Sequence, residues 1–250
     1  PGDTTSDKFP AYAAFVGELA GAGADAIEVW NEMNIDREWK AGSISPSNYV
    51  PMLQQAYNAI KARNPATLVI SGAPAPTGFF GGCSGAGCDD NFYVQGMVNA
   101  GALNYVDCIG IHYNEGVLSP TQTGGDPRGN PNHYTRYYQT MVDTYYNAGG
   151  GKRKLCFTEL GYLSGGGYSP PLAEAAPGFA WATDTSVDEQ AQWLAEAASL
   201  SRQSGKVRLM IVFNVDFTAW GQDPQGGYAI IRPNGGCPAC ETLRGVTGGR

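Results

Sequence analysis

The sequence has few histidines, few charged residues and no long apolar stretch. Only His112 and His133 are present among 250 residues, so a zinc hydrolase that relies on histidine ligands lacks its ligand set. No apolar run approaches the roughly 20 residues of a membrane-spanning helix, and Pro1 does not open a charged and then apolar targeting signal. We therefore expect no membrane partner and expect any targeting segment to be already removed.

Positive charge is also scarce. The chain has 16 Lys and Arg against 23 Asp and Glu, a formal net charge of -7, and its longest basic run is the triplet Lys152-Arg153-Lys154. So few clustered positive charges can neutralise little of a phosphate backbone, and nucleic acid is therefore not expected as a partner. With 42% hydrophobic and only 16% charged residues, the composition is that of a folded chain, and we expect one globular domain over residues 1–250.

Four of the six cysteines form two close pairs in Gly- and Pro-rich loops. Cys83 and Cys88 are the first and last residues of CSGAGC, and Cys237 and Cys240 are those of CPAC. Short loop pairs are typical of disulfides in an oxidising compartment, which predicts a secreted or extracellular protein. A zinc site made by the four thiols is the alternative, because CxxC is also a metal half-site, but a second CxxC is missing. We expect disulfides and no metal.

The other two cysteines lie inside apolar runs. Cys108 is in VDCIGI and Cys156 is in KLCFTEL. A free cysteine in such a setting behaves as a small buried hydrophobic residue. Both are therefore expected to be unpaired core residues.

Helical and strand-like segments alternate along the chain. The helical periodicity covers 9–22, 47–63, 92–99, 133–148, a segment from Ser186 and a short one near Pro238. The strand-like runs are 26–30, 67–71, 108–112, 154–159 and 207–213. Alternating units with nearly continuous apolar strands predict a parallel sheet covered by helices, either doubly wound or a barrel. No Gly-x-Gly-x-x-Gly follows a strand, which disfavours a nucleotide-binding sheet.

Two glutamates stand at the ends of predicted strands. Glu32 follows the first strand in IEVWNEMN, and Glu159 ends the fourth in LCFTELGY. In a parallel sheet both strand ends meet at one rim, where barrel enzymes place catalytic groups. Glycoside hydrolysis needs such a pair of carboxylates and no other ionisable group. The plain alternative is that each glutamate is only a solvated strand end.

The two motifs together resemble clan A of the retaining glycoside hydrolases, which includes families 5 and 39. In that clan the general acid/base ends strand four and the nucleophile ends strand seven, so the resemblance implies these roles for Glu32 and Glu159. The five strands would then be strands four to eight of an α/β, (β/α)8 TIM barrel that lacks its first three βα units. Residues 1–250 would form the catalytic domain, with the absent units cleaved off, supplied by a partner chain, or never present.

The resemblance also implies roles for three residues beside the glutamates. Asn31 would form a hydrogen bond with the sugar 2-hydroxyl, and the alternative is that it is a simple turn residue. His112 and Tyr113 in IHYN would stand at the same rim, with Tyr113 donating to the nucleophile and His112 either contacting substrate or simply packing. Glu32 would need a raised pKa to stay protonated near neutrality.

Three tryptophans are candidate sugar platforms, because an aromatic face can bury the apolar side of a pyranose. The resemblance to clan A implies that Trp220, in the segment after the last strand, forms the floor of the subsite that holds the cleaved sugar. Trp181, at the end of the loop 164–185, is a second candidate, whereas Trp30 lies inside a strand and is expected in the core. Glu28 on the same strand should need a cationic partner. Only Arg208 stands at the inward end of another strand, so the partner is otherwise expected in the absent βα units.

The resemblance implies a retaining β-glycosidase that cleaves an oligo- or polysaccharide without a cofactor, and retention predicts that its two carboxyl groups lie about 5–5.5 Å apart. The alternative is a carbohydrate-binding or surface-structural protein on the same scaffold that has lost turnover. The sugar, the linkage and endo or exo action depend on loop shape, which these patterns leave open.

Overall fold

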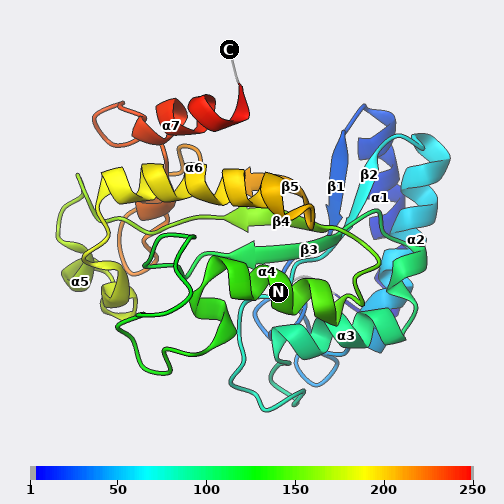
Figure 1. Cartoon of the computed structure of the whole chain (residues 1–250). Coiled ribbons are helices and arrows are strands. Elements are labelled where there is room, and N and C mark those ends of the chain that lie inside the picture. The colour runs from blue at the N-terminus through cyan, green and yellow to red at the C-terminus, as the bar shows by residue number, and fades with distance from the viewer. Residues whose placement is uncertain (1–3, 249–250) are drawn as a thin grey trace. The chain divides into compact units, whose positions relative to one another are not determined.

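The computed structural model describes residues 4–248, in which five strands alternate with seven α-helices (Figure 1). The strands are β1 (Ala26–Val29), β2 (Leu68–Ser71), β3 (Ile109–Tyr113), β4 (Leu155–Leu160) and β5 (Val207–Val212). The helices are α1 (Phe9–Gly21), α2 (Pro46–Arg63), α3 (Asp90–Asn99), α4 (Tyr138–Ala148), α5 (Leu172–Ala175), α6 (Val187–Ser204) and α7 (Pro238–Thr247). The expected alternation and the count of five strands are confirmed. No helix in 4–248 is long and apolar enough to cross a membrane.

The chain divides into two compact units. Of the described residues, the first unit comprises 4–112 and 144–157, and the second comprises 113–143 and 158–248. In the first unit, β1 and β2 pair in parallel, from Ala26 opposite Leu68 to Val29 opposite Ser71. Cys108, just before β3, bridges to Ile70 of β2 in the same sense. Helices α1 and α2 lie side by side in this unit (Figure 1).

Strands β3 and β4 run through both units and are neighbours in the sheet order β3-β4-β5. In the first unit the N–H of Ile109 donates to Lys154 O at 3.0 Å, and in the second the N–H of Gly161 donates to Tyr113 O at 3.0 Å. The N-terminal ends of β3 and β4 therefore pair with each other, and so do their C-terminal ends, which means that the two strands are parallel. The carboxyl ends of these strands, where the predicted site lies, therefore share one edge of the sheet.

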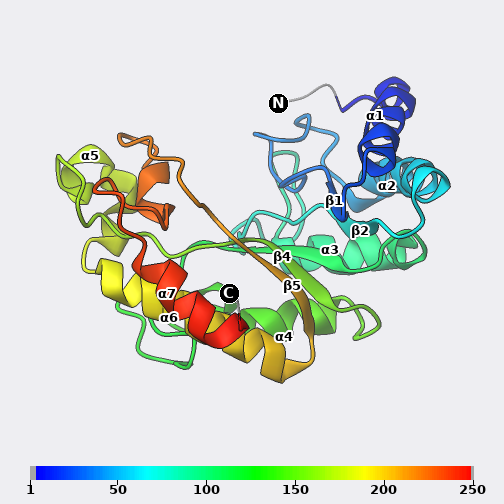
Figure 2. The ribbon, with the colours of Figure 1, turned by 90° about the horizontal axis from the view of Figure 1, so that it is seen from above.

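In the second unit, α7 lies along α6 (Figure 2). Ser186 starts α6 with a reciprocal capping box: its hydroxyl accepts from the Glu189 N–H at 3.1 Å, and the Glu189 carboxylate accepts from the Ser186 N–H at 2.8 Å. This satisfies donors that a helix start otherwise leaves open. The sequence-predicted start of this helix at Ser186 is thus confirmed within one residue.

Several predicted boundaries move. The first strand ends at Val29, because Trp30 takes a left-handed backbone with φ 69°. Helix α2 begins at Pro46, one residue before the expected 47, and Ser45 caps it: the Ser45 hydroxyl accepts from the Ser47 N–H. The helix expected over 133–148 begins only at Tyr138, after a 3-10 turn. The loop 164–185 contains α5 and a second 3-10 turn.

Three disulfides join all six cysteines. Cys83–Cys88 and Cys237–Cys240 are the two expected loop pairs, so these thiols do not form the alternative zinc site. The expectation of free Cys108 and Cys156 is wrong: both are fully buried as predicted, but they are bonded to each other. The reason is the parallel pairing of β3 and β4, which places residues 48 positions apart next to each other.

Candidate active site

Glu32 lies three residues after the end of β1 and is nearly buried, with 8% of its surface exposed. Its N–H donates to Ala73 O at 2.9 Å, which ties this segment to the one that follows β2. Its backbone has φ 41°, in the left-handed region that side chains other than glycine rarely adopt. Strained backbone of this kind clusters at functional sites, where the surrounding structure maintains it.

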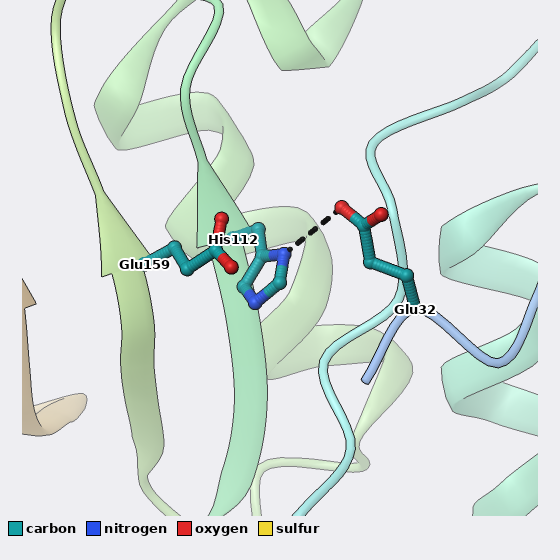
Figure 3. A group of neighbouring side chains, drawn as sticks. All are labelled: Glu32, His112 and Glu159. Carbon is teal, nitrogen blue, oxygen red and sulfur yellow. Dashed lines mark hydrogen bonds and ion pairs between the residues drawn. The ribbon is translucent and has the colours of Figure 1, made fainter. Parts of the chain in front are cut away.

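The Glu32 carboxylate has two positively polarised partners. His112 Nδ1 lies 3.2 Å from Oε1 (Figure 3), and the guanidinium of Arg37 forms an ion pair with Oε2. Burial alone would raise the pKa of Glu32, but the hydrogen bond and charge of His112, together with Arg37, lower it below its ordinary value. The expectation of a raised pKa of Glu32 is therefore wrong for this state, because the ion pair with Arg37 depends on a loop conformation that no sequence motif indicates.

His112 is the link between two carboxylates of the first unit. It is fully buried on β3, and its second ring nitrogen, Nε2, lies 4.0 Å from Glu28 Oε1. The Glu28 carboxylate also accepts from the Ala73 N–H at 2.8 Å. Glu28 is therefore stabilised by a histidine and a backbone amide.

Glu159 is the penultimate residue of β4 and belongs to the second unit. Its Oε2 accepts from Asn114 Nδ2 at 2.8 Å. Asn114 is anchored in turn, because the buried Tyr228 hydroxyl donates to its carbonyl oxygen at 2.9 Å. Gly161 keeps this space open: a Cβ there would lie 2.2 Å from Phe213 O and 3.3 Å from Asn114 Oδ1.

Tyr113 does not supply the hydrogen bond that we expected it to donate to Glu159. Its hydroxyl donates to Arg136 O at 3.4 Å, and its ring packs edge-on against Tyr138 and Tyr162. Burial raises its pKa. The neighbouring Asn114 donates to Glu159 instead, and the sequence signal was available, since alternate residues of an extended segment share a side and Asn114 is two positions from His112.

Asn31 and Trp30 differ in their surroundings. Asn31 is half-buried, and within residues 4–248 its side chain makes no hydrogen bond to protein, which leaves its amide available to a ligand. Trp30 was expected in the core but is only partly buried, because it follows the end of β1: its ring meets Tyr12 and Trp39 edge-on, and its indole N–H donates to Glu38 O at 3.1 Å.

The two predicted platforms, Trp181 and Trp220, both pack at the edge of one apolar cluster of the second unit. Trp220 stacks on Tyr168 with ring centroids 4.5 Å apart, and its indole N–H donates to Pro170 O at 2.9 Å. The guanidinium carbon of Arg128 lies 5.1 Å from the centre of the Trp181 ring. Each indole is therefore held in a fixed orientation, and contact with a sugar stays a prediction for both.

Comparison with solved structures gives the fold. A family 39 glycoside hydrolase from the gut symbiont Bacteroides cellulosilyticus WH2 aligns with 97% of this chain at a TM-score of 0.60 and 20% identity. A family 39 β-xylosidase from Caulobacter crescentus aligns with 94% at 0.54 and 19% identity, and the family 53 catalytic domain of Ignisphaera aggregans with 95% at 0.60 and 15% identity. The fold is similar to that of clan A glycoside hydrolases. The resemblance read from the two glutamate motifs is confirmed at this level.

The match covers only part of the compared proteins. The chain spans 45%, 46% and 66% of the lengths of these three structures, respectively. Five strands are present within residues 4–248, against eight in a complete barrel. The α/β class and parallel pairing are as expected, and a closed barrel is not formed by the described residues. No model of a protein family and no curated protein sequence matches the chain.

Proposed function

We propose that this protein is a retaining β-glycosidase in which Glu32 is the general acid/base and Glu159 the nucleophile. The observation that supports it most is the pair of hydrogen bonds from one segment: His112 contacts Glu32, and Asn114 donates to Glu159. Residues two apart on an extended segment point to the same side. We therefore expect both carboxylates on one side of the end of β3, about 5–5.5 Å apart as retention requires.

The proposed reaction has two displacements. Glu159 attacks the anomeric carbon while Glu32 gives its proton to the leaving oxygen; Glu32 then takes a proton from the water that hydrolyses the glycosyl–Glu159 ester. Asn114 orients the Glu159 carboxylate through an amide N–H. The available amide of Asn31 is proposed to bind the 2-hydroxyl, and Trp181 and Trp220 to carry the sugar faces.

The ion pair between Arg37 and Glu32 opposes the first step of this mechanism. An acid catalyst must be protonated before it can donate, but the Arg37 ion pair stabilises ionised Glu32. The Arg37 side chain is 69% exposed and belongs to a loop, so an incoming leaving-group sugar can displace it at little cost. We propose that substrate binding breaks this ion pair and thereby raises the pKa of Glu32.

The wider setting is proposed on the same basis. Three disulfides are typical of an oxidising compartment, which supports a secreted enzyme acting on an oligo- or polysaccharide. Further βα units, within one polypeptide or from a partner chain, are proposed to complete the barrel. The Arg37 ion pair is also the one observation that favours the second candidate, a carbohydrate-binding protein without turnover.

The test is hydrolysis of a panel of aryl β-glycosides by the intact protein and by the Glu32→Gln and Glu159→Gln variants. Each variant is expected to lose at least about a thousandfold in kcat, because general acid catalysis alone contributes roughly 10²–10⁴ and the nucleophile forms the covalent intermediate. Azide is expected to rescue activity of Glu32→Ala by replacing the water that needs a general base.

The matched control is Glu174→Gln, an exposed glutamate on α5 outside the proposed site. It should retain full activity. Wild-type rates in either active-site variant would contradict the proposal. Glycan binding by calorimetry with no product release from the intact protein would favour the second candidate instead.

A further inference from the structure

A pocket of about 540 Å³ lies in the second unit, made of the loop after β4 and the segment before α7. Its lining is mostly backbone and small side chains: Gly166, Gly167, Val187, Arg232, Pro233, Asn234, Gly236 and Pro238. Arg232 is the only ionisable residue of this lining. The proposed catalytic residues contribute nothing to it.

Arg232 is a buried cation without a carboxylate. Only 6% of its surface is exposed, and within residues 4–248 no acidic side chain pairs with it. Its terminal nitrogens donate to four carbonyl oxygens, those of Ser164, Gly166, Gly227 and Ala229, at 2.5–3.4 Å. Burial lowers its pKa, which reflects the unfavourable desolvation of the charge. A buried charge of this kind is normally compensated by an opposite one.

One donor of this guanidinium remains unused. The Nε–H of Arg232 is buried and makes no hydrogen bond to the described protein. A buried N–H without a partner costs about 1–3 kcal/mol, and a bound ion or water is one explanation of such a group in a native structure. Arg232, which lines the pocket, therefore carries both an uncompensated charge and an unsatisfied donor.

Two helices begin at the same pocket. Val187 is the first residue of α6 and Pro238 the first of α7, and both line the cavity. Helices of 18 and 10 residues each carry about half a positive charge at this end. Three carboxylates in the first turns of these helices oppose the positive charge of the helix starts. Their effect is reduced, because Glu189 is engaged in the cap of Ser186 and because Asp188 and Glu241 are exposed to solvent.

We propose that this pocket binds an oxyanion, a carboxylate, sulfate or phosphate group, through Arg232 and the starts of α6 and α7. The pocket is separate from the proposed catalytic residues, but a stack of side chains connects the pocket to the proposed sugar platform Trp220. The Arg232 guanidinium lies 5.1 Å from the centre of the Tyr168 ring, and Tyr168 stacks on Trp220. The oxyanion is either a free inorganic ion or the acidic group of a glycan.

The test measures thermal unfolding and calorimetric binding with sodium sulfate, inorganic phosphate and sodium glucuronate, each against sodium chloride of equal ionic strength. The wild-type protein should be stabilised beyond the chloride reference. In the Asn234→Asp variant the dissociation constant should rise roughly tenfold, because a like charge now faces the anion. The Asp side chain can still accept the Gly236 N–H that Asn234 accepts at 2.9 Å, so the loop should keep its conformation.

Asn132→Asp is the matched control: it adds the same charge at an exposed residue that does not line the pocket, and it should bind like wild type. Arg232→Met should lose binding if its circular dichroism is unchanged, and Asn234→Asp carries the test if that variant fails to fold. Binding of sulfate and phosphate alone identifies a free ion, and binding of glucuronate as well identifies an acidic sugar. Stabilisation no larger than that by chloride, or equal responses of Asn234→Asp and Asn132→Asp, would overturn the proposal.

Discussion

At the scale of single residues, the state of Glu32 depends on what faces it. Burial favours the protonated acid, whereas His112 and Arg37 favour the carboxylate, and the second effect is larger. The Glu32 motif could be read from the sequence because strand ends are where barrel enzymes place their carboxylates. The ion pair between Arg37 and Glu32 could not be predicted from the sequence, because it depends on a loop conformation that no periodicity encodes.

The first prediction at this scale concerns Arg37→Ala. Removing the guanidinium removes a group that lowers the pKa of Glu32, so the pKa rises and the protonated acid persists to higher pH. The basic limb of the kcat/KM profile should move up by about half a pH unit, because an ion pair with an exposed partner contributes roughly 0.2–1 kcal/mol and 1.36 kcal/mol corresponds to one pKa unit.

Arg63→Ala is the matched control, since Arg63 forms an ion pair with Glu18 on exposed helix surface. It should leave the profile unchanged. A basic limb that stays in place or moves to lower pH in Arg37→Ala would show that Arg37 does not control the acid. The same comparison can be made by NMR titration of the Glu32 carboxyl group if turnover is too slow to measure.

At the scale of elements, the strands and helices followed from hydrophobic periodicity and capping residues, and the errors have specific causes. Trp30 continues the apolar run but turns into a left-handed conformation, which ends β1 early. Tyr113 was favoured by family resemblance, yet strand alternation puts Asn114 on the side of His112. Cys108 and Cys156 looked like isolated core residues because their pairing depends on strand order, which is a tertiary property.

The disulfide between β3 and β4 gives a prediction for the element scale. Replacing Cys108 and Cys156 by alanine should lower the free energy of unfolding by about 2–4 kcal/mol, because the bond closes a long loop in the unfolded chain. The matched change of Cys237 and Cys240, only three residues apart, should cost less. Urea denaturation measures both, and an equal or larger loss for the short loop would contradict this account.

At the scale of the whole molecule, fold and function rest on different observations. Structures of at most 20% identity share the fold, and a fold of this kind carries many chemistries. The catalytic proposal therefore depends on Glu32, Glu159 and the segment from His112 to Asn114, not on the alignment. Within residues 4–248, the buried Arg232 is the feature that points to an anion.

The most direct test of the central claim is the mass of the peptide that contains Glu159. The intact protein carrying Glu32→Gln is mixed with aryl β-glycosides whose leaving groups need no acid, quenched, digested and measured by mass spectrometry. Without its general base the variant should accumulate the covalent intermediate, so this peptide should gain the mass of one glycosyl residue. An active protein with no adduct, or with the adduct on another residue, would contradict the account.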